Sequence, residues 1–469
     1  MKSDSIKHAF DLYQAGQLEA AEAVSKRIIA NGEDSGRALL LCGMIAQQRA
    51  QTPQAIDLLR QAVAAEPEEP AAYKRLAMSL QVSGRSEEAL AELRTAVARA
   101  PARADAWKNL IGLLASLGRT NELARVEAEQ AAFRKRIGAI EARFDQACKL
   151  LLKGNYEDGW KAFESRLEAP EFAALVDMPC PRWRGEPLEG RSILLRCEQG
   201  HGDSLQFFRY VQAVIDRGAD VTVETWKDLA RLFRMNTSAA IHVKLKASEA
   251  APQGYDFYCP MMSLPYVLGT RLDTIPGRTS YLAAEPALVR KWCVDLKDDG
   301  RFRVGLVWAG GRRLLNPAMV SIDQRRSLEF SAFERLLDIA GMAFYSLQKQ
   351  EAAEQARGAV ESGRLIDRTD ELADFADTAA LIESLDLVIA VDTAVAHLAA
   401  AMNKPTWILS RFDGCWRWLE DREDSPWYPS VRLFRQKTPG DWDEVMVRVH
   451  KALAFLATNQ GLDQAVTGG

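Results

Sequence analysis

The sequence predicts an α-helical solenoid followed by two α/β units, each built on a parallel sheet. Small or apolar residues recur every 34 residues in the first quarter of the chain, at Ala21, Ala55, Ala89 and Leu123. From residue 191 onward, short apolar segments alternate with amphipathic ones. That alternation is typical of parallel strands joined by helices, so the fold class is α followed by α/β.

A period of 34 residues is the length of a tetratricopeptide repeat, a helical hairpin with a tight turn and a small residue where its helices touch. The turn position follows the same register, with glycine in three units and alanine in the second (Gly16, Ala50, Gly84 and Gly118), and Pro67 and Pro101 close two units. Stacked repeats leave a concave groove that binds a peptide or another protein. An ordinary helical bundle is the alternative, and three series in one register disfavour it.

The chain is expected to divide into five parts. About four repeats would fill residues 1–136, and a capping helical hairpin would fill 137–169. Two prolines, Pro179 and Pro181, indicate a linker before the first strand. The first α/β unit is expected at 170–298, the second at 299–457 with a hinge at Asp299 and Gly300, and a flexible tail at 458–469.

Apolar segments place the expected strands. They are residues 192–196, 221–224 and 241–245 in the first unit, and 302–308, 343–347, 387–391 and 406–409 in the second. A tight turn is expected at residues 200–203, with a helix after it from Leu205 to Ile215. Two such units imply a cleft between them, and ligands of open parallel sheets bind outside the carboxyl ends of the strands.

Net charge, the length of the apolar runs and the spacing of cysteine and histidine disfavour several classes of function. The net charge of −4 disfavours a protein that grips nucleic acid, which normally shows a basic excess. We expect a cytoplasmic chain without a membrane span, since no apolar run reaches about 18 residues. The seven cysteines and five histidines show neither Cys-x-x-Cys nor His-x-x-x-His spacing, so no metal site is expected.

The strongest local motif runs from Asp392 to Pro405. An apolar strand ends at Asp392, and Thr393 is placed to cap a helix that begins with Ala394 and Val395. Free amides at such a helix start bind phosphate, and small residues let a diphosphate approach the backbone. A plain cap between a strand and a helix is the alternative.

This motif, Asp-Thr-x-x-x-His-Leu-Ala-Ala-Ala-x-x-x-Pro, resembles the heptosyltransferase-like family 9 glycosyltransferases of GT-B fold. Gly200-x-Gly202-Asp203 after the first strand resembles them too. The continuation Trp416-Arg417-Trp418-Leu419 and the segment 421–436 are similar to a bacterial subgroup that joins tetratricopeptide repeats to such a transferase. The broad group includes flagellin glycosyltransferases, and the joining of repeats to a GT-B unit resembles O-GlcNAc transferases.

The resemblance implies transfer of a sugar from a nucleotide sugar to a Ser or Thr hydroxyl of a protein, with flagellin as the first acceptor to consider. It implies an inverting, metal-independent reaction with the nucleotide sugar as co-substrate and no other cofactor. The first α/β unit would face the acceptor, and the second would bind the donor. A heptosyltransferase of lipopolysaccharide assembly is one alternative, and a non-catalytic scaffold is another.

The same resemblance suggests roles for single residues. Asp203 occupies the place of the catalytic base, although an aspartate there is equally a helix cap. His201 would be a second acid–base group or an exposed turn residue. Lys349, beside Gln348, resembles the diphosphate-contacting lysine of O-GlcNAc transferases, and a solvated lysine is the alternative. His397 would be a helix residue packed in the interior, or one that reaches the cleft.

Two further segments stay open. The loop after Trp308 and Gly310 would face the donor, but residues 311–317 depart from the family's pattern, so the donor sugar is open and a silent member is conceivable. Aromatic residues between Trp416 and Tyr428 would either stack on a nucleotide base or fasten a long loop to the domain. No residue distinguishes the base of the donor.

Overall fold

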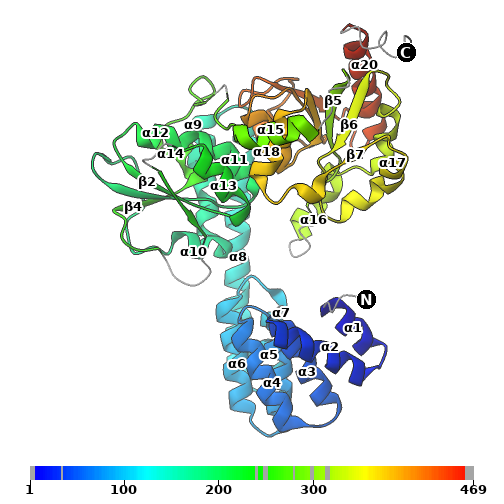
Figure 1. Cartoon of the computed structure of the whole chain (residues 1–469). Helices are drawn as coiled ribbons and strands as arrows, with labels where there is room; N and C mark the ends of the chain where they lie inside the picture. Colours follow the sequence, from blue (N-terminus) through cyan, green and yellow to red (C-terminus); the bar gives the residue numbers. More distant parts are fainter. Residues whose placement is uncertain are drawn as a thin grey trace. The chain divides into compact units, whose positions relative to one another are not determined.

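The computed structural model describes residues 6–32, 35–237, 241–246, 252–277, 280–295, 300–311 and 317–459. The chain consists of two compact units, Met1–Glu141 and Ala142–Gly469 (Figure 1). Asp299 of the expected hinge, most of the divergent loop at 311–317 and residues 460–469 of the expected tail lie outside the described residues.

The first unit consists of paired helices. In chain order they are α1 (Ile6–Gln14), α2 (Leu18–Asn31), α3 (Ser35–Gln48), α4 (Thr52–Ala65), α5 (Pro70–Val82), α6 (Ser86–Arg99), α7 (Ala104–Ser116) and the start of α8 (Thr120–Leu152). The four turn positions predicted from the period all have positive φ, 76° at Gly16, 57° at Ala50, 76° at Gly84 and 66° at Gly118. The small residues at 21, 55 and 89 are fully buried between helices. The predicted repeats are confirmed.

Helix α8 runs without a break through residue 137, where the sequence placed the start of a capping hairpin. The segment holds no proline and one glycine, Gly138, which is too little to end a helix. The hairpin partner of its last turns is α9 (Tyr156–Phe163), which starts after Gly154 in a left-handed turn with φ 79°. Short helices follow, η1 (Glu164–Glu168), η2 (Pro170–Phe172) and α10 (Ala173–Val176).

The first α/β part holds a four-stranded parallel sheet in the order β3-β2-β1-β4. Its strands are β1 (Ser192–Arg196), β2 (Asp220–Thr225), β3 (Ile241–Leu245) and β4 (Phe257–Pro260). The helices are α11 (His201–Phe207), η3 (Phe208–Tyr210), α12 (Val211–Ile215), α13 (Lys227–Met235), η4 (Met261–Ser263) and α14 (Leu264–Val267). The turn expected at residues 200–203 is wrong, because α11 already begins at His201.

The second α/β part holds a six-stranded sheet in the order β10-β9-β8-β5-β6-β7, also parallel throughout. Its strands are β5 (Phe302–Val307), β6 (Met342–Ser346), β7 (Ile366–Asp367), β8 (Leu387–Val391), β9 (Thr406–Ser410) and β10 (Val431–Arg435). The strand order reverses between β5 and β8. The prediction of helical repeats followed by parallel α/β structure is confirmed.

Helices surround this second sheet. The α-helices are α15 (Pro286–Asp295), α16 (Pro317–Arg326), α17 (Arg357–Glu361), α18 (Phe375–Glu383), α19 (Ala394–Ala401) and α20 (Trp442–Asn459). The 3-10 turns are η5 (Phe330–Ala332), η6 (Glu334–Leu336), η7 (Glu351–Ala356), η8 (Thr369–Glu371) and η9 (Trp416–Trp418). Among the described residues, we find no helix with the length and apolar character that a membrane span requires.

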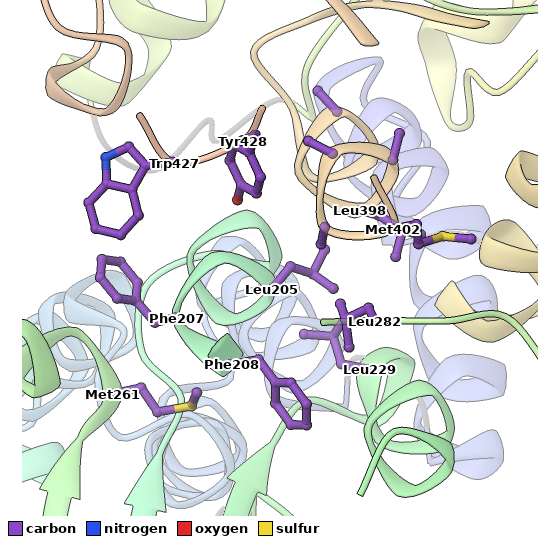
Figure 2. Packing of buried hydrophobic residues seen from close by; sticks show 14 of the residues in the cluster. Leu205, Phe207, Phe208, Leu229, Met261, Leu282, Leu398, Met402, Trp427 and Tyr428 are labelled. Carbon is purple, nitrogen blue, oxygen red and sulfur yellow. The ribbon is translucent and has the colours of Figure 1, made fainter. Parts of the chain in front are cut away.

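Helices α11 and α19 join the two sheets through one continuous core (Figure 2). Leu205 of α11 points toward Leu398 of α19, and Phe207 faces Trp427, with ring centroids 6.0 Å apart. This packing brings the N-terminal ends of α11 and α19 together, since a Cβ on Gly202 would lie 3.5 Å from the Cα of Ala394.

Candidate functional site

The predicted donor residues lie at the carboxyl edge of the six-stranded sheet. Trp308 and Gly310 follow β5, Gln348 and Lys349 follow β6, and Asp392 follows β8, and these three strands are neighbours. The order reverses between β5 and β8, so this edge is the switch point at which open parallel sheets bind ligands.

A cavity of about 550 Å³ opens beside this edge. Its walls are the loop after β5, the loop after β6 and the second half of α16. Most of the residues that line it have polar side chains, with Asp323, Gln324, Ser327, Gln348, Lys349 and Gln350 among them. The volume suits a ligand of nucleotide size.

Gln348 ties the two loops together. Its buried Oε1 accepts hydrogen bonds from the backbone N–H of Trp308 (3.1 Å) and of Ala309 (2.9 Å). The Lys349 side chain is exposed at the cavity and donates from Nζ to the Leu372 carbonyl. The Trp308 ring is fully buried against Phe330, so only its backbone takes part in the site.

Gly310 and Arg326 form a close contact at the cavity wall. A Cβ on Gly310 would overlap the guanidinium of Arg326, so a larger residue here would displace that side chain. Arg326 donates from Nη1 to the Asp392 carbonyl (2.9 Å) and pairs through Nη2 with Asp323 (2.6 Å). The Arg326 side chain is only 17% exposed and joins α16 to the end of β8.

The start of α19 combines free amides with an unusual threonine. Thr393 takes the extended N-cap conformation (φ −138°, ψ 168°), but its side chain makes no capping bond. Its buried Oγ1 has no hydrogen-bond partner within the described part of the chain. Ala394 and Val395 follow as the first helical residues, so their N–H groups lack carbonyl partners inside the helix. This helix start is suited to an anionic ligand.

Asp392 is a carboxylate next to that helix start. Burial alone would raise its pKa, but the hydrogen bond and charge of His397, with Arg417 and Arg326, hold the pKa well below its usual range. Nε2 of His397 lies 3.6 Å from Oδ1 of Asp392. The His397 ring is buried, stacks on Trp418 with centroids 5.3 Å apart, and places Nδ1 2.9 Å from the Tyr428 hydroxyl. His397 therefore lies on the buried side of α19, packed in the protein interior.

Asp203 occupies the first turn of α11 and uses both carboxylate oxygens. Oδ2 accepts a hydrogen bond from the N–H of Gly200 (2.8 Å), which is the capping interaction that the sequence left open. Oδ1 pairs with Nη2 of Arg417, from the loop after β9. The side chain is 18% exposed. The Asp203 carboxylate thus lies at the junction of the two α/β parts. One of its hydrogen-bond donors, Gly200, follows a strand of the first sheet, and the other, Arg417, follows a strand of the second.

His201, the first residue of α11, lies between both α/β parts. Its ring stacks on Phe375 of α18 with centroids 5.4 Å apart, and Nε2 lies 3.6 Å from Asp228 of α13. Burial lowers the pKa of His201, and Asp228 opposes that shift in part. His201 is therefore an interface residue, 37% exposed.

The aromatic segment between Trp416 and Tyr428 is buried. Trp416, Trp418, Trp427 and Tyr428 are each less than 10% exposed. Trp416 contacts the ring of Trp160 of α9, with centroids 5.2 Å apart. These rings fasten the loop to the domain, which is the second of the two roles considered, and the guanidinium of Arg417 lies over the ring of Trp416.

Comparison with known proteins gives a family match for each of two segments of the chain. The description "Glycosyltransferase family 9 (heptosyltransferase)" matches residues 343–409, and "Tetratricopeptide repeat" matches residues 48–127. The chain carries tetratricopeptide repeats and a glycosyltransferase family 9 domain. The family 9 match runs from β6 to β9 and contains Gln348, Lys349, Asp392 and Thr393.

Individual proteins are similar to parts of the chain. Protein FlbA of Caulobacter vibrioides is 30% identical over 346 residues, 68% of this chain and 55% of the relative, so the chain spans about half the length of this curated relative. A glycosyl transferase family 9 structure from Veillonella parvula is 10% identical (TM-score 0.42) and covers 58% of this chain and 100% of its own. TTC0263, a tetratricopeptide-repeat protein of Thermus thermophilus, is 18% identical (TM-score 0.24) and covers 36% and 91%.

Proposed function

We propose that this chain is a glycosyltransferase that moves a sugar from a nucleotide-sugar donor to a Ser or Thr hydroxyl of a protein held by its repeats. The observation that carries the proposal is the cavity beside Lys349 and Gly310, at the switch edge of the six-stranded sheet. The family 9 match covers the strand and loop that form one of its walls. We place the reaction in the cytoplasm, where nucleotide sugars are made.

In the proposed reaction, the phosphate groups of the donor lie against the amides that begin α19. The Lys349 ammonium neutralises the charge that develops on the departing nucleotide. The acceptor oxygen bonds to the anomeric carbon while the bond from that carbon to the phosphate oxygen of the nucleotide breaks. Asp203 takes the proton of the acceptor hydroxyl. A single displacement of this kind inverts the anomeric centre, and the proposal assigns no step to a metal ion.

The repeats support a protein acceptor. Two apolar side chains on α5 face solvent, Met78 at 43% and Val82 at 78% exposure, within the unit that matches tetratricopeptide repeats. A small saccharide acceptor would need no such surface. Flagellin is the acceptor to test first, because the sequence resembles the group that includes flagellin glycosyltransferases.

Calorimetric titration of UDP, CMP, ADP and GDP into the full chain tests the donor site. We expect one nucleotide to bind selectively, and Lys349→Ala to weaken its binding about 10-fold through loss of a charge-assisted contact. Lys404→Ala is the matched control, since Lys404 precedes β9 and so lies at the opposite, amino edge of the sheet. Its variant should bind as the wild type does.

Two results would contradict the proposal. Absence of binding by all four nucleotides would leave a scaffold as the better description of the chain. Equal weakening by both lysine variants would place the nucleotide elsewhere. Transfer itself is measured by the intact mass of flagellin incubated with the chain and a donor, where Asp203→Asn should abolish the added mass.

A further inference from the structure

Arg417 holds a central position that neither the proposed reaction nor the family match explains. Its guanidinium makes four contacts: Nε donates to Oε1 of Gln206 (2.6 Å), Nη1 lies 3.1 Å from Sγ of Cys415, Nη2 pairs with Asp203, and the central carbon lies 4.2 Å from the ring centre of Trp416. The side chain is 11% exposed. Such a set of contacts leaves the guanidinium little freedom to turn.

Arg417 makes the second of the two contacts that fix the orientation of the Asp203 carboxylate. Asp203 receives the N–H of Gly200 on Oδ2 and the guanidinium of Arg417 on Oδ1, so rotation of the carboxylate plane would break one bond or the other. Gly200 follows β1 of the four-stranded sheet, whereas Arg417 follows β9 of the six-stranded sheet. The orientation of Asp203 therefore depends on both sheets at once.

Adhesion between the two α/β parts does not account for this pair. Arg209 already joins them, since it donates to the Trp427 carbonyl (2.8 Å) and lies over the rings of Tyr281 and Tyr428. The aromatic core around Phe207 and Trp427 adds apolar burial to the same junction. A buried ion pair adds little net stability, because removing two charges from water offsets most of their attraction.

We propose that Arg417 is a positioning residue for glycosyl transfer, which orients the Asp203 carboxylate toward the acceptor hydroxyl. This inference rests on the proposed function, because that function gives Asp203 its role as the base. An arginine suits the task, since its planar fork can serve Gln206 and Asp203 at once from fixed directions. A lysine would keep the charge and lose the two fixed directions.

Arg417→Lys and Arg209→Lys form a matched pair for the test. Steady-state transfer is measured with UDP-N-acetylglucosamine, CMP-N-acetylneuraminic acid, ADP-heptose and GDP-mannose as donors and flagellin as acceptor. We expect Arg417→Lys to lower kcat roughly 10- to 100-fold with the donor KM unchanged, because the base is present but misoriented. Arg209→Lys should reduce thermal stability without a selective loss of kcat.

Two additional variants keep the test decisive if Arg417→Lys folds poorly. Arg417→Ala should regain part of its kcat when guanidinium chloride is added at concentrations too low to unfold the protein. Gln206→Met removes the acceptor for Nε and leaves Asp203 untouched, so it should give a smaller loss of kcat, again at constant KM.

The outcomes separate the inference from the proposed function. Wild-type kcat in Arg417→Lys and Gln206→Met, or parallel losses in Arg417→Lys and Arg209→Lys, would overturn the positioning role while transfer itself stands. A wild-type chain that transfers sugar from none of the four donors would overturn the proposed function, and with it this inference.

Discussion

Nδ1 of His397 lies 2.9 Å from the hydroxyl oxygen of Tyr428. Burial raises the pKa of the Tyr428 phenol well above its usual value, so the hydroxyl stays protonated beside the imidazole. The other ring nitrogen of His397, Nε2, lies 3.6 Å from Oδ1 of Asp392. Tyr428 and Asp392 therefore orient the buried ring through its two nitrogens, beside the start of α19.

Tyr428→Phe should destabilise the α/β part by about 1–3 kcal/mol, because it leaves Nδ1 of the buried His397 without its hydrogen-bond partner while keeping the aromatic ring in place. Urea unfolding followed by tryptophan fluorescence measures the change. Tyr266→Phe is the control, since Tyr266 is 44% exposed, and its midpoint should match that of the wild type. Equal midpoints for both variants would show that the bond contributes nothing.

Gly202→Ala tests the contact between α11 and α19. The added Cβ would lie 2.9 Å from Cδ2 of His397 and 3.5 Å from the Cα of Ala394, so either side chain or helix must move. We expect a loss of about 1–3 kcal/mol from overpacking. Gly358→Ala in α17 is the matched control, because nothing lies within 4 Å of its Cβ position, and it should be neutral or slightly stabilising. Similar behaviour of both variants in urea unfolding would argue against the tight contact.

Two variants of Gln348 separate its contribution to stability from its contribution to ligand binding. Gln348→Leu removes the acceptor of two backbone N–H groups and should destabilise the protein by about 1–3 kcal/mol for each amide that stays unpaired. Gln348→Glu keeps an acceptor oxygen and adds a negative charge at the cavity. It should retain more stability than the leucine variant yet bind nucleotide more weakly, as unfolding and calorimetry together would show. Unchanged nucleotide affinity in Gln348→Glu would place the phosphates away from this wall.

Most of the fold was predictable because it is periodic. The 34-residue register fixed the repeats so firmly that Ala50 takes a left-handed conformation, φ 57°, at a position where the other units have glycine. The seven predicted strands all exist, and most of them are runs of buried residues, although β3 is only partly buried. Strand β4 escaped prediction because it has four residues and ends in Pro260, β7 because it has only two residues, and β10 because Arg432 and Arg435 interrupt its apolar pattern.

The site was predictable only in part. Lys349, Gly310 and Asp392 each follow a strand, and parallel topology brings the carboxyl ends of neighbouring strands to one edge. Pairings between distant segments leave no periodic signal: 214 residues separate Asp203 from Arg417, and 66 separate Arg326 from Asp392. From the sequence, the aromatic residues near Arg417 could either stack on a nucleotide base or fasten the loop to the domain. Their burial between α9, α11 and the sheet decides against stacking on a base.

The free energy of unfolding should depend on pH through the protonation of His201. Burial lowers the pKa of this histidine below its ordinary value of 6.5, so near and below that pH the unfolded chain binds more protons than the folded one. The folded state therefore loses stability as pH falls through 6.5 toward the folded pKa, and the loss is complete below the folded pKa. His201→Gln should flatten this part of the stability profile, measured by urea unfolding from about pH 7.5 to 5. His242→Gln, at a position 71% exposed, is the control and should keep the wild-type slope.

The exposed apolar pair on α5 should recruit the protein acceptor. Met78→Glu and Val82→Glu change solvent-facing side chains, so stability and nucleotide binding should stay within the spread of surface substitutions, about 0.5 kcal/mol. Modification of flagellin should fall sharply, because each variant places a charge where an apolar segment would dock.

Phe455→Glu on α20 is the matched control for this surface, since Phe455 is 70% exposed and lies outside the repeats. Mass spectrometry of flagellin after incubation with each variant gives the comparison. Loss of modification in Phe455→Glu as well, or full modification in both α5 variants, would mean that the acceptor does not bind through this face of the repeats. Loss confined to the α5 variants would separate recruitment by the repeats from the chemistry at Asp203.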